Sequence, residues 1–302
     1  MLCPKGVITA LVTPFKKSDE SIDYDALKKM IDYQCGAGVD GIFVSGTTAE
    51  AYAMEPSEKR ELLRATVDFV KGRATVYFGA GGNSTRQTVE LVQIAESGGA
   101  DAVSVITPYF ATPNQNELQN YFTDIAVSTS LPIILYNHPL RTSVNIAGAT
   151  IGALSRIKNI VGVKDSSANM NNTMSYLANM EAGFSVLSGN DSLIMSVMDL
   201  GGMGAVSASA NFIPELVTEL YRAYAAGKRD KAAELQMKIF SIRELFNLGT
   251  YPAMIKDACK LMGIDMGICR KPVSPLSADD NKKLKDALMA MRQVRINSTN
   301  NT

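Results

Sequence analysis

Eight short apolar runs alternate with longer stretches of helical character along the chain, and this alternation limits the possible folds more than any other feature. These runs are nearly continuous in apolar residues and do not show the regular polar–apolar alternation of a half-exposed strand, which is typical of strands buried on both faces. The predicted strands cover residues 7–14, 40–46, 75–81, 102–108, 132–137, 160–166, 184–190 and 204–211.

The stretches between these runs have the pattern of amphipathic helices. Residues 23–38, for example, place Leu27, Met30 and Ile31 on one stripe and charged residues elsewhere. Eight strand–helix units in succession predict an α/β protein with a closed (β/α)8 TIM barrel. An open, doubly wound sheet is the alternative, although it usually has fewer strands and a phosphate-binding loop near its start.

The pattern changes after the eighth run. Residues 214–247 are helical in pattern throughout. Further helices are expected at 252–263 and 279–294. We therefore divide the chain into a barrel that carries the active site, residues 1–225, and a helical C-terminal region, residues 226–302. The polar tail, residues 295–302, is expected to be disordered.

Composition and charge restrict the possible partners. The 302 residues include 30 Lys and Arg and 30 Asp and Glu, so binding to nucleic acid or to an anionic membrane surface is not expected. The start has no signal-peptide pattern, and no apolar stretch reaches the ~18 residues of a membrane-spanning helix. Four scattered cysteines without a C-x-x-C motif indicate a cytoplasmic protein. A single histidine, His138, argues against a zinc site and against Ser-His-Asp chemistry.

The sixth run, IVGVKDS, ends with a lysine. In a (β/α)8 barrel the active site lies at the carboxyl ends of the strands, which is where Lys164 is expected. Burial there disfavours an ammonium ion, and a neutral lysine amine is a nucleophile that forms Schiff bases with ketones. The alternative is a lysine that reaches solvent at the barrel rim, and the strand pattern alone gives the two interpretations equal weight.

Other strand ends carry groups that suit such chemistry. Tyr136 ends the neighbouring fifth run, where its phenol can carry protons for an imine-forming lysine, or can be a core tyrosine with a satisfied hydroxyl. Thr47 and Thr48, in the turn GTTAE, suit a carboxylate, although an ordinary strand-to-helix turn has the same pattern. Arg141 can hold a second carboxylate bidentately or form a surface ion pair.

The motifs GTTAE, YNHPLRT and VGVKDSS, in this order and spacing, resemble the dihydrodipicolinate synthase/N-acetylneuraminate lyase family, and the resemblance extends over residues 6–276. It implies a barrel that is usually a homotetramer (a dimer of dimers) and uses neither a metal nor an organic cofactor. It also implies that Lys164 forms a Schiff base with pyruvate, that Tyr136 is the proton relay, and that Thr47 and Thr48 hold the pyruvate carboxylate. The same resemblance assigns further substrate-binding positions to Val206, Gly189, Asn190 and Tyr109.

Arg141 decides between branches of this family. It resembles the arginine of the synthase branch, which binds the carboxylate of aspartate semialdehyde, the substrate that is condensed with pyruvate. Sialic acid lyases have a small or apolar residue there, and they have an acidic pair where this chain has Asp191 and Ser192. The resemblance therefore implies a lyase of lysine biosynthesis that acts on pyruvate and a small aldehyde.

Three departures from the synthase pattern keep other substrates open. Ala49 and Ser143 replace glycines. Phe110 stands where synthases have a tyrosine that crosses a subunit interface into the catalytic relay with Thr47 and Tyr136. Tyr109 or a water can substitute for the missing hydroxyl. One alternative is an aldolase or dehydratase of a 2-keto-3-deoxy sugar acid, or an N-acetylneuraminate lyase-like aldolase, with the same lysine. A more remote one is a barrel that binds a keto acid without catalysis.

Overall fold

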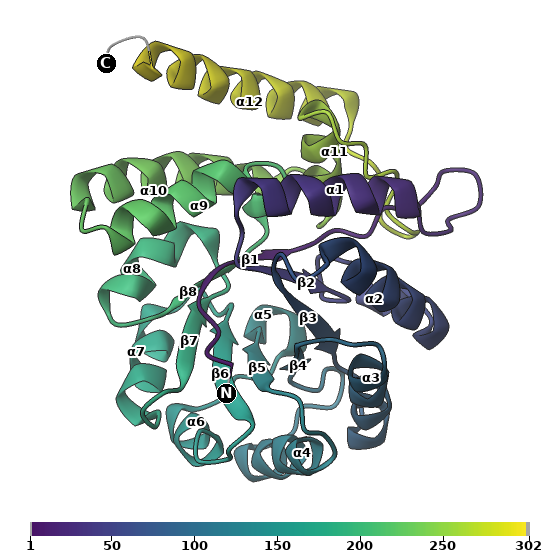
Figure 1. Ribbon diagram of the computed structural model, residues 1–302, viewed down its shortest axis with the longest axis vertical. Helices are drawn as coiled ribbons and strands as arrows, with labels where there is room; N and C mark the ends of the chain where they lie inside the picture. Colours follow the sequence, from purple (N-terminus) through teal and green to yellow (C-terminus); the bar gives the residue numbers. More distant parts are fainter. Residues whose placement is uncertain (1, 300–302) are drawn as a thin grey trace.

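Eight parallel strands form a closed barrel in the order of the sequence in the computed structural model, which describes residues 2–299 and the side chains of residues 2–291. Figure 1 shows the strands at the centre and the helices around them. The predicted (β/α)8 TIM barrel is therefore confirmed. The strands are β1 (Gly6–Ala10), β2 (Gly41–Val44), β3 (Thr75–Ala80), β4 (Ala102–Ile106), β5 (Ile133–Asn137), β6 (Ile160–Asp165), β7 (Ser185–Ser188) and β8 (Gly204–Ser207).

All eight predicted strands are present, and most end before the predicted limit because the predicted ranges include residues that lie beyond the strand ladder. Asn211 illustrates the reason. Its Oδ1 accepts a hydrogen bond from the N–H of Val12 (3.0 Å), and its Nδ2 donates to the carbonyl of Ala10 (2.8 Å). A side chain thus joins the ends of the first and eighth runs where the strand ladder has already stopped.

Helices follow every strand. α1 (Tyr24–Ala37) begins at Asp23, whose carboxylate caps the first turn, and ends at Gly38, which has a φ of 75°. The other helices of the barrel are α2 (Pro56–Val70), α3 (Thr85–Ser97), α4 (Gln115–Val127), α5 (Pro139–Thr142), α6 (Gly148–Leu154), α7 (Met170–Asn179) and α8 (Ile194–Asp199), with short 3-10 turns at η1 (Ala51–Ala53), η2 (Asp191–Leu193) and η3 (Ser209–Asn211).

The apolar core has two layers. The larger layer lies between the strands and the helices and includes the fully buried Phe78, Phe122 and Tyr176. The smaller cluster fills the barrel interior, and Leu2 and Met203 pack against it. The members of this interior cluster are Ile8, Ala10, Phe43, Tyr77, Ala102, Ile134, Val161, Leu187 and Val206. The interior is therefore a packed core rather than a channel, and a substrate site is expected at the mouth.

The helices after β8 cover one side of the barrel. They are α9 (Pro214–Ala225), α10 (Arg229–Arg243), η4 (Glu244–Asn247), α11 (Ala253–Leu261) and α12 (Ala278–Thr299). The prediction that residues 214–247 are helical throughout is wrong at Gly227, where a φ of 73° separates α9 from α10. The two helices then lie side by side, as Figure 1 shows.

The predicted disorder of the tail is wrong for residues 295–299, which continue α12. Extending an existing helix by one residue is much easier than starting one, which is why a polar sequence can still be helical there. Residues 300–302 lie outside the described residues. The division of the chain after residue 225 stays a prediction, since α10 and α11 pack against η2 and η3 of the barrel.

No helix among the described residues combines the length and the apolar character that crossing a membrane requires.

Candidate active site

An irregularity in β6 turns Lys164 into the barrel. The register of β6 against β5 shifts by one residue at Val161. Val161 belongs to the interior cluster, whereas Val163, two residues later, belongs to the outer core. A bulge of this kind re-aims the side chains that follow it, so Lys164 faces inwards at the carboxyl end of the strand, with 5% of its surface exposed.

Lys164 lies beside two aromatic rings. It pairs in register with Tyr136 of β5, and its Nζ is 3.9 Å from the centroid of the Tyr136 ring. The same nitrogen is 5.0 Å from the ring centroid of Phe43. An amine and a phenol from adjacent strands therefore share one wall of the barrel mouth, an arrangement that suits proton transfer to a carbonyl compound at the amine.

The turn after β2 brings two hydroxyls to the same region. The N–H groups of Ala49 and Ala51 donate to the carbonyl of Gly46 at 3.1 and 3.2 Å, and this tight turn places Thr47 and Thr48 at the mouth. Hydroxyls and the N–H groups of such a turn are suitable donors to a carboxylate.

A cavity of about 310 Å³ lies over these groups, and we call it the mouth cavity. Its volume is at the lower end of the range of ligand pockets, which suits small molecules. The lining residues are Ala10, Thr47, Thr48, Tyr136, His138, Leu140, Arg141, Lys164, Ser166, Gly189, Asp191, Val206, Ala208, Arg243, Phe246 and Tyr251.

Two arginines give the mouth cavity a positive character. Arg141, an exposed residue of α5, has its Cζ 5.3 Å from the centroid of the Tyr251 ring. Arg243, at the end of α10, stacks on Phe246 with its Cζ 4.4 Å from the ring centroid. The ion pairs found among the described residues include neither arginine, so both guanidinium groups can interact with an anionic ligand.

The pKa of His138 reflects the positive charges around the mouth cavity. Burial, followed by the positive charges of Lys164, Arg141 and Arg243, lowers the pKa of His138 to about 3. The imidazole is therefore neutral around pH 7. Burial is the larger cause of this shift and the three cations add to it; the same cations favour anionic ligands such as carboxylates.

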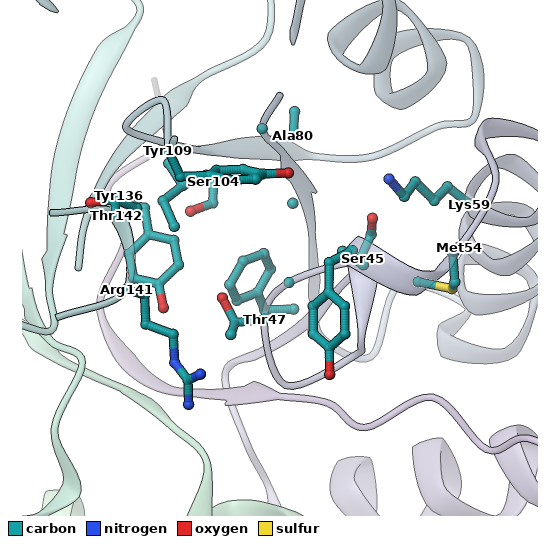
Figure 2. A pocket seen from close by; sticks show the side chains of 17 residues that line it. Ser45, Thr47, Met54, Lys59, Ala80, Ser104, Tyr109, Tyr136, Arg141 and Thr142 are labelled. Atoms are coloured by element: carbon teal, nitrogen blue, oxygen red, sulfur yellow. The ribbon is translucent and has the colours of Figure 1, made fainter. Parts of the chain in front are cut away.

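A second cavity, also of about 310 Å³, adjoins the mouth cavity, because Thr47, Tyr136 and Arg141 line both. Figure 2 shows these three residues on one side of the second cavity and Lys59 on the other. Burial lowers the pKa of Lys59. Tyr109 also lines this cavity.

Most of the residues predicted from the sequence come together in the mouth cavity: Lys164, Tyr136, Thr47, Thr48, Arg141, Gly189 and Val206. Tyr109 lies instead in the second cavity. Asn190 is absent from the lining of both cavities. Its side chain accepts a hydrogen bond from the N–H of Ser192 (3.0 Å) at the start of η2.

The C-terminal region contributes a wall of the mouth cavity that was not predicted from the sequence, and this wall includes Arg243, Phe246 and Tyr251. The predicted site residues stand at or near strand ends, whereas these three follow the last strand. A signal was available in α11, where Lys256 stands within a buried apolar stretch and therefore requires a buried partner. That partner is Glu50, in the GTTAE turn.

The fold and this set of residues define a (β/α)8 barrel with an amine, a phenol and two hydroxyls gathered at its mouth. The chain matches the model of the Dihydrodipicolinate synthetase family over residues 3–291, and it belongs to that family.

Individual relatives cover almost the whole chain. The 4-hydroxy-tetrahydrodipicolinate synthase of Methanococcus maripaludis strain C6 is 39% identical over 285 residues, which are 94% of this chain and 97% of that protein. The crystal structure of dihydrodipicolinate synthase from Aquifex aeolicus is 35% identical with a TM-score of 0.92, over 96% of this chain and 98% of that one. A prophage protein of the same family from E. coli K12, crystallised in complex with pyruvate, is 32% identical with a TM-score of 0.92, over 95% and 98% of the two chains.

Proposed function

We propose that this protein is a lyase that joins pyruvate to Lys164 as a Schiff base and condenses it with aspartate semialdehyde. The observation that carries the proposal is the position of the Lys164 Nζ, which lines the mouth cavity 3.9 Å from the ring centroid of Tyr136. Relatives that bear the name 4-hydroxy-tetrahydrodipicolinate synthase, and the pyruvate complex of the prophage relative, support the choice of substrates.

In the proposed reaction, the Lys164 amine attacks C2 of pyruvate, and the former carbonyl oxygen takes up a proton. Tyr136 passes a proton from the nitrogen to this hydroxyl, which leaves as water, and a protonated imine remains. Loss of a proton from the methyl group gives an enamine, whose carbon attacks the aldehyde. Thr47 and Thr48 hold the pyruvate carboxylate, and Arg141 holds the carboxylate of the aldehyde.

A coupled assay with pyruvate and aspartate semialdehyde tests the proposal, together with borohydride reduction in pyruvate and intact-mass measurement. We expect both a trapped adduct and condensation. Without a trapped adduct the Schiff-base mechanism fails. An adduct without turnover on any aldehyde would instead indicate a barrel that binds a keto acid without catalysis.

A second candidate function has one specific observation in its favour. Phe110, with 98% of its surface exposed, stands where the resemblance expects a relay tyrosine, and it has no hydroxyl. A 2-keto-3-deoxy sugar acid aldolase or dehydratase could use the same lysine with a different second step. Cleavage of such acids, with near-zero condensation of aspartate semialdehyde, would favour this candidate.

Arg141→Ala is expected to weaken the binding of the second substrate, the aldehyde, far more than the binding of pyruvate. A bidentate guanidinium–carboxylate contact contributes roughly 1.5–3 kcal/mol, so the KM for the aldehyde should rise about 10- to 150-fold. Pyruvate adduct formation should be largely kept, since Lys164, Tyr136 and the threonines remain. Steady-state kinetics in each substrate measure the split. Equal loss for both substrates would show that the assigned role of Arg141 is wrong.

The assembly and the location belong to the same proposal. We propose a homotetramer, built as a dimer of dimers, in the cytoplasm. The exposed ring of Phe110, on a backbone with a φ of 79°, supports self-association, because a bare aromatic side chain in a strained conformation suits an interface. Light scattering of the purified protein tests the assembly.

A further inference from the structure

The C-terminal region places a phenol, Tyr251, in the mouth cavity. Tyr251 lies in the loop between η4 and α11, and its side chain is half-buried against the cavity. Its hydroxyl oxygen is 2.5 Å from the Oγ1 of Thr48, and either hydroxyl can be the donor. A segment about 200 residues away in the sequence thus meets the turn that follows β2.

A second contact anchors the same two segments. The Nζ of Lys256 in α11 lies 2.7 Å from the Oε1 of Glu50, and both side chains are buried. Glu50 follows Thr48 by two residues, and Lys256 follows Tyr251 by five. The ring of Phe246 also packs near the phenol, with its centroid 6.2 Å from that of Tyr251. The contact between the two hydroxyls is therefore part of a built interface.

Hydrogen-bond counting gives this contact a function. Two bonded hydroxyls have two hydrogens and share one, so one hydrogen remains to donate elsewhere. A carboxylate next to Thr48 accepts this hydrogen and thereby sets the direction of the chain. Tyr251 then donates to Thr48, and Thr48 donates to the carboxylate. Each bond in such a chain strengthens the next.

The phenol is suited to remain the donor. Burial raises the pKa of Tyr251. The hydrogen bond with Thr48 offsets part of this rise and the nearby Tyr136 adds to it, so the hydroxyl keeps its proton across the pH range of an assay.

We propose that Tyr251 is a positioning residue for the substrate carboxylate, which it serves by directing the Thr48 hydroxyl into the mouth cavity. This inference rests on the proposed function, because it takes the ligand to be a 2-oxo acid bound at Lys164. It differs from a proton-relay role for Tyr251, in which the phenol would act on the chemical steps rather than on the binding of the carboxylate.

Tyr251→Phe removes the hydroxyl and keeps the ring. The pyruvate concentration that gives half-maximal borohydride-trapped adduct should rise about 2- to 12-fold, as expected for the loss of the neutral hydrogen bond that orients the Thr48 hydroxyl. Turnover at saturating pyruvate and aldehyde should stay within about threefold of the wild-type value. The lost interaction stabilises the bound substrate and the transition state equally, so its removal affects binding and not the chemical steps. Thr48→Val should raise this pyruvate concentration in the same way. In the double variant Thr48→Val/Tyr251→Phe the concentration should be no higher than in Thr48→Val alone.

Controls separate this role from packing and from the proposed function itself. Tyr224→Phe removes a phenol hydroxyl on α9, outside both cavity linings, and should leave pyruvate saturation unchanged. Thr48→Ser, which keeps the hydroxyl, should weaken pyruvate saturation less than Thr48→Val does. The inference is overturned if Tyr251→Phe leaves pyruvate saturation unchanged. It is also overturned if the fold-change in half-saturating pyruvate in the double variant equals the product of the two single fold-changes. A wild-type protein that forms no pyruvate adduct sinks the proposed function and this inference together.

Discussion

Lys164→Ala is expected to form no pyruvate adduct and to lose at least about 10⁴-fold in turnover, because the nucleophile of the proposed reaction is removed. The side chain is 5% exposed and pairs in register with Tyr136, and among the described residues that line the mouth cavity it is the only lysine. Borohydride trapping followed by intact-mass measurement, with the coupled assay in parallel, checks both parts of the expectation.

Two further variants make this result specific. Lys164→Arg keeps a cation at the site but cannot form the imine, so it should be as inactive as Lys164→Ala. Lys158→Ala removes an exposed lysine just before β6 and should keep both the adduct and turnover. Lys59 provides the critical check, because burial lowers its pKa and it lines the adjoining cavity. An adduct on Lys59 in the Lys164→Ala protein would overturn the assignment of the nucleophile.

The sequence was sufficient to predict the barrel, because strands buried on both faces leave continuous apolar runs whatever their register. The lengths of the strands could not be predicted in the same way. Apolar residues that follow β1 and β8 remain buried but are held by Asn211 instead of by the strand ladder. The break at Gly227 depends on one backbone conformation, which a helical pattern of side chains does not reveal.

The residues of the site likewise fall into those that the sequence pattern could predict and those that it could not. Lys164, Tyr136, Thr47 and Thr48 could be found because each stands at a strand end, and the ends of parallel strands meet at one mouth. The inward direction of Lys164 depends on the irregularity of β6 at Val161, a feature that no local pattern predicts. The wall built by Arg243, Phe246 and Tyr251 depends on how the C-terminal region packs, and long-range packing is not encoded in periodicity.

Lys256→Met is expected to lower the free energy of unfolding by about 3–5 kcal/mol, the usual cost of leaving one partner of a buried ion pair alone. The Lys256 side chain is 2% exposed and that of Glu50 is fully buried. After the substitution, Glu50 keeps the hydrogen bond from the N–H of Arg270 (2.8 Å) but has lost its countercharge. Urea unfolding followed by circular dichroism measures the change.

A matched control lies one helical turn away. Lys260 is on the same helix and pairs with Asp265 at 2.9 Å, but its side chain is 64% exposed. Lys260→Met should therefore cost less than about 1 kcal/mol. The double variant Glu50→Gln/Lys256→Met should recover much of the loss, because it leaves no buried charge unpaired.

The same ion pair connects stability to the site. It joins α11, which begins just after Tyr251, to the turn that carries Thr47 and Thr48. When it is removed, the phenol of Tyr251 is no longer held against Thr48, so pyruvate saturation should weaken in Lys256→Met as it does in Tyr251→Phe. A protein that is destabilised by several kcal/mol but binds pyruvate normally would show that the phenol keeps its place without this anchor. A loss below about 1 kcal/mol would contradict the electrostatic argument itself, since that is the range of an exposed pair.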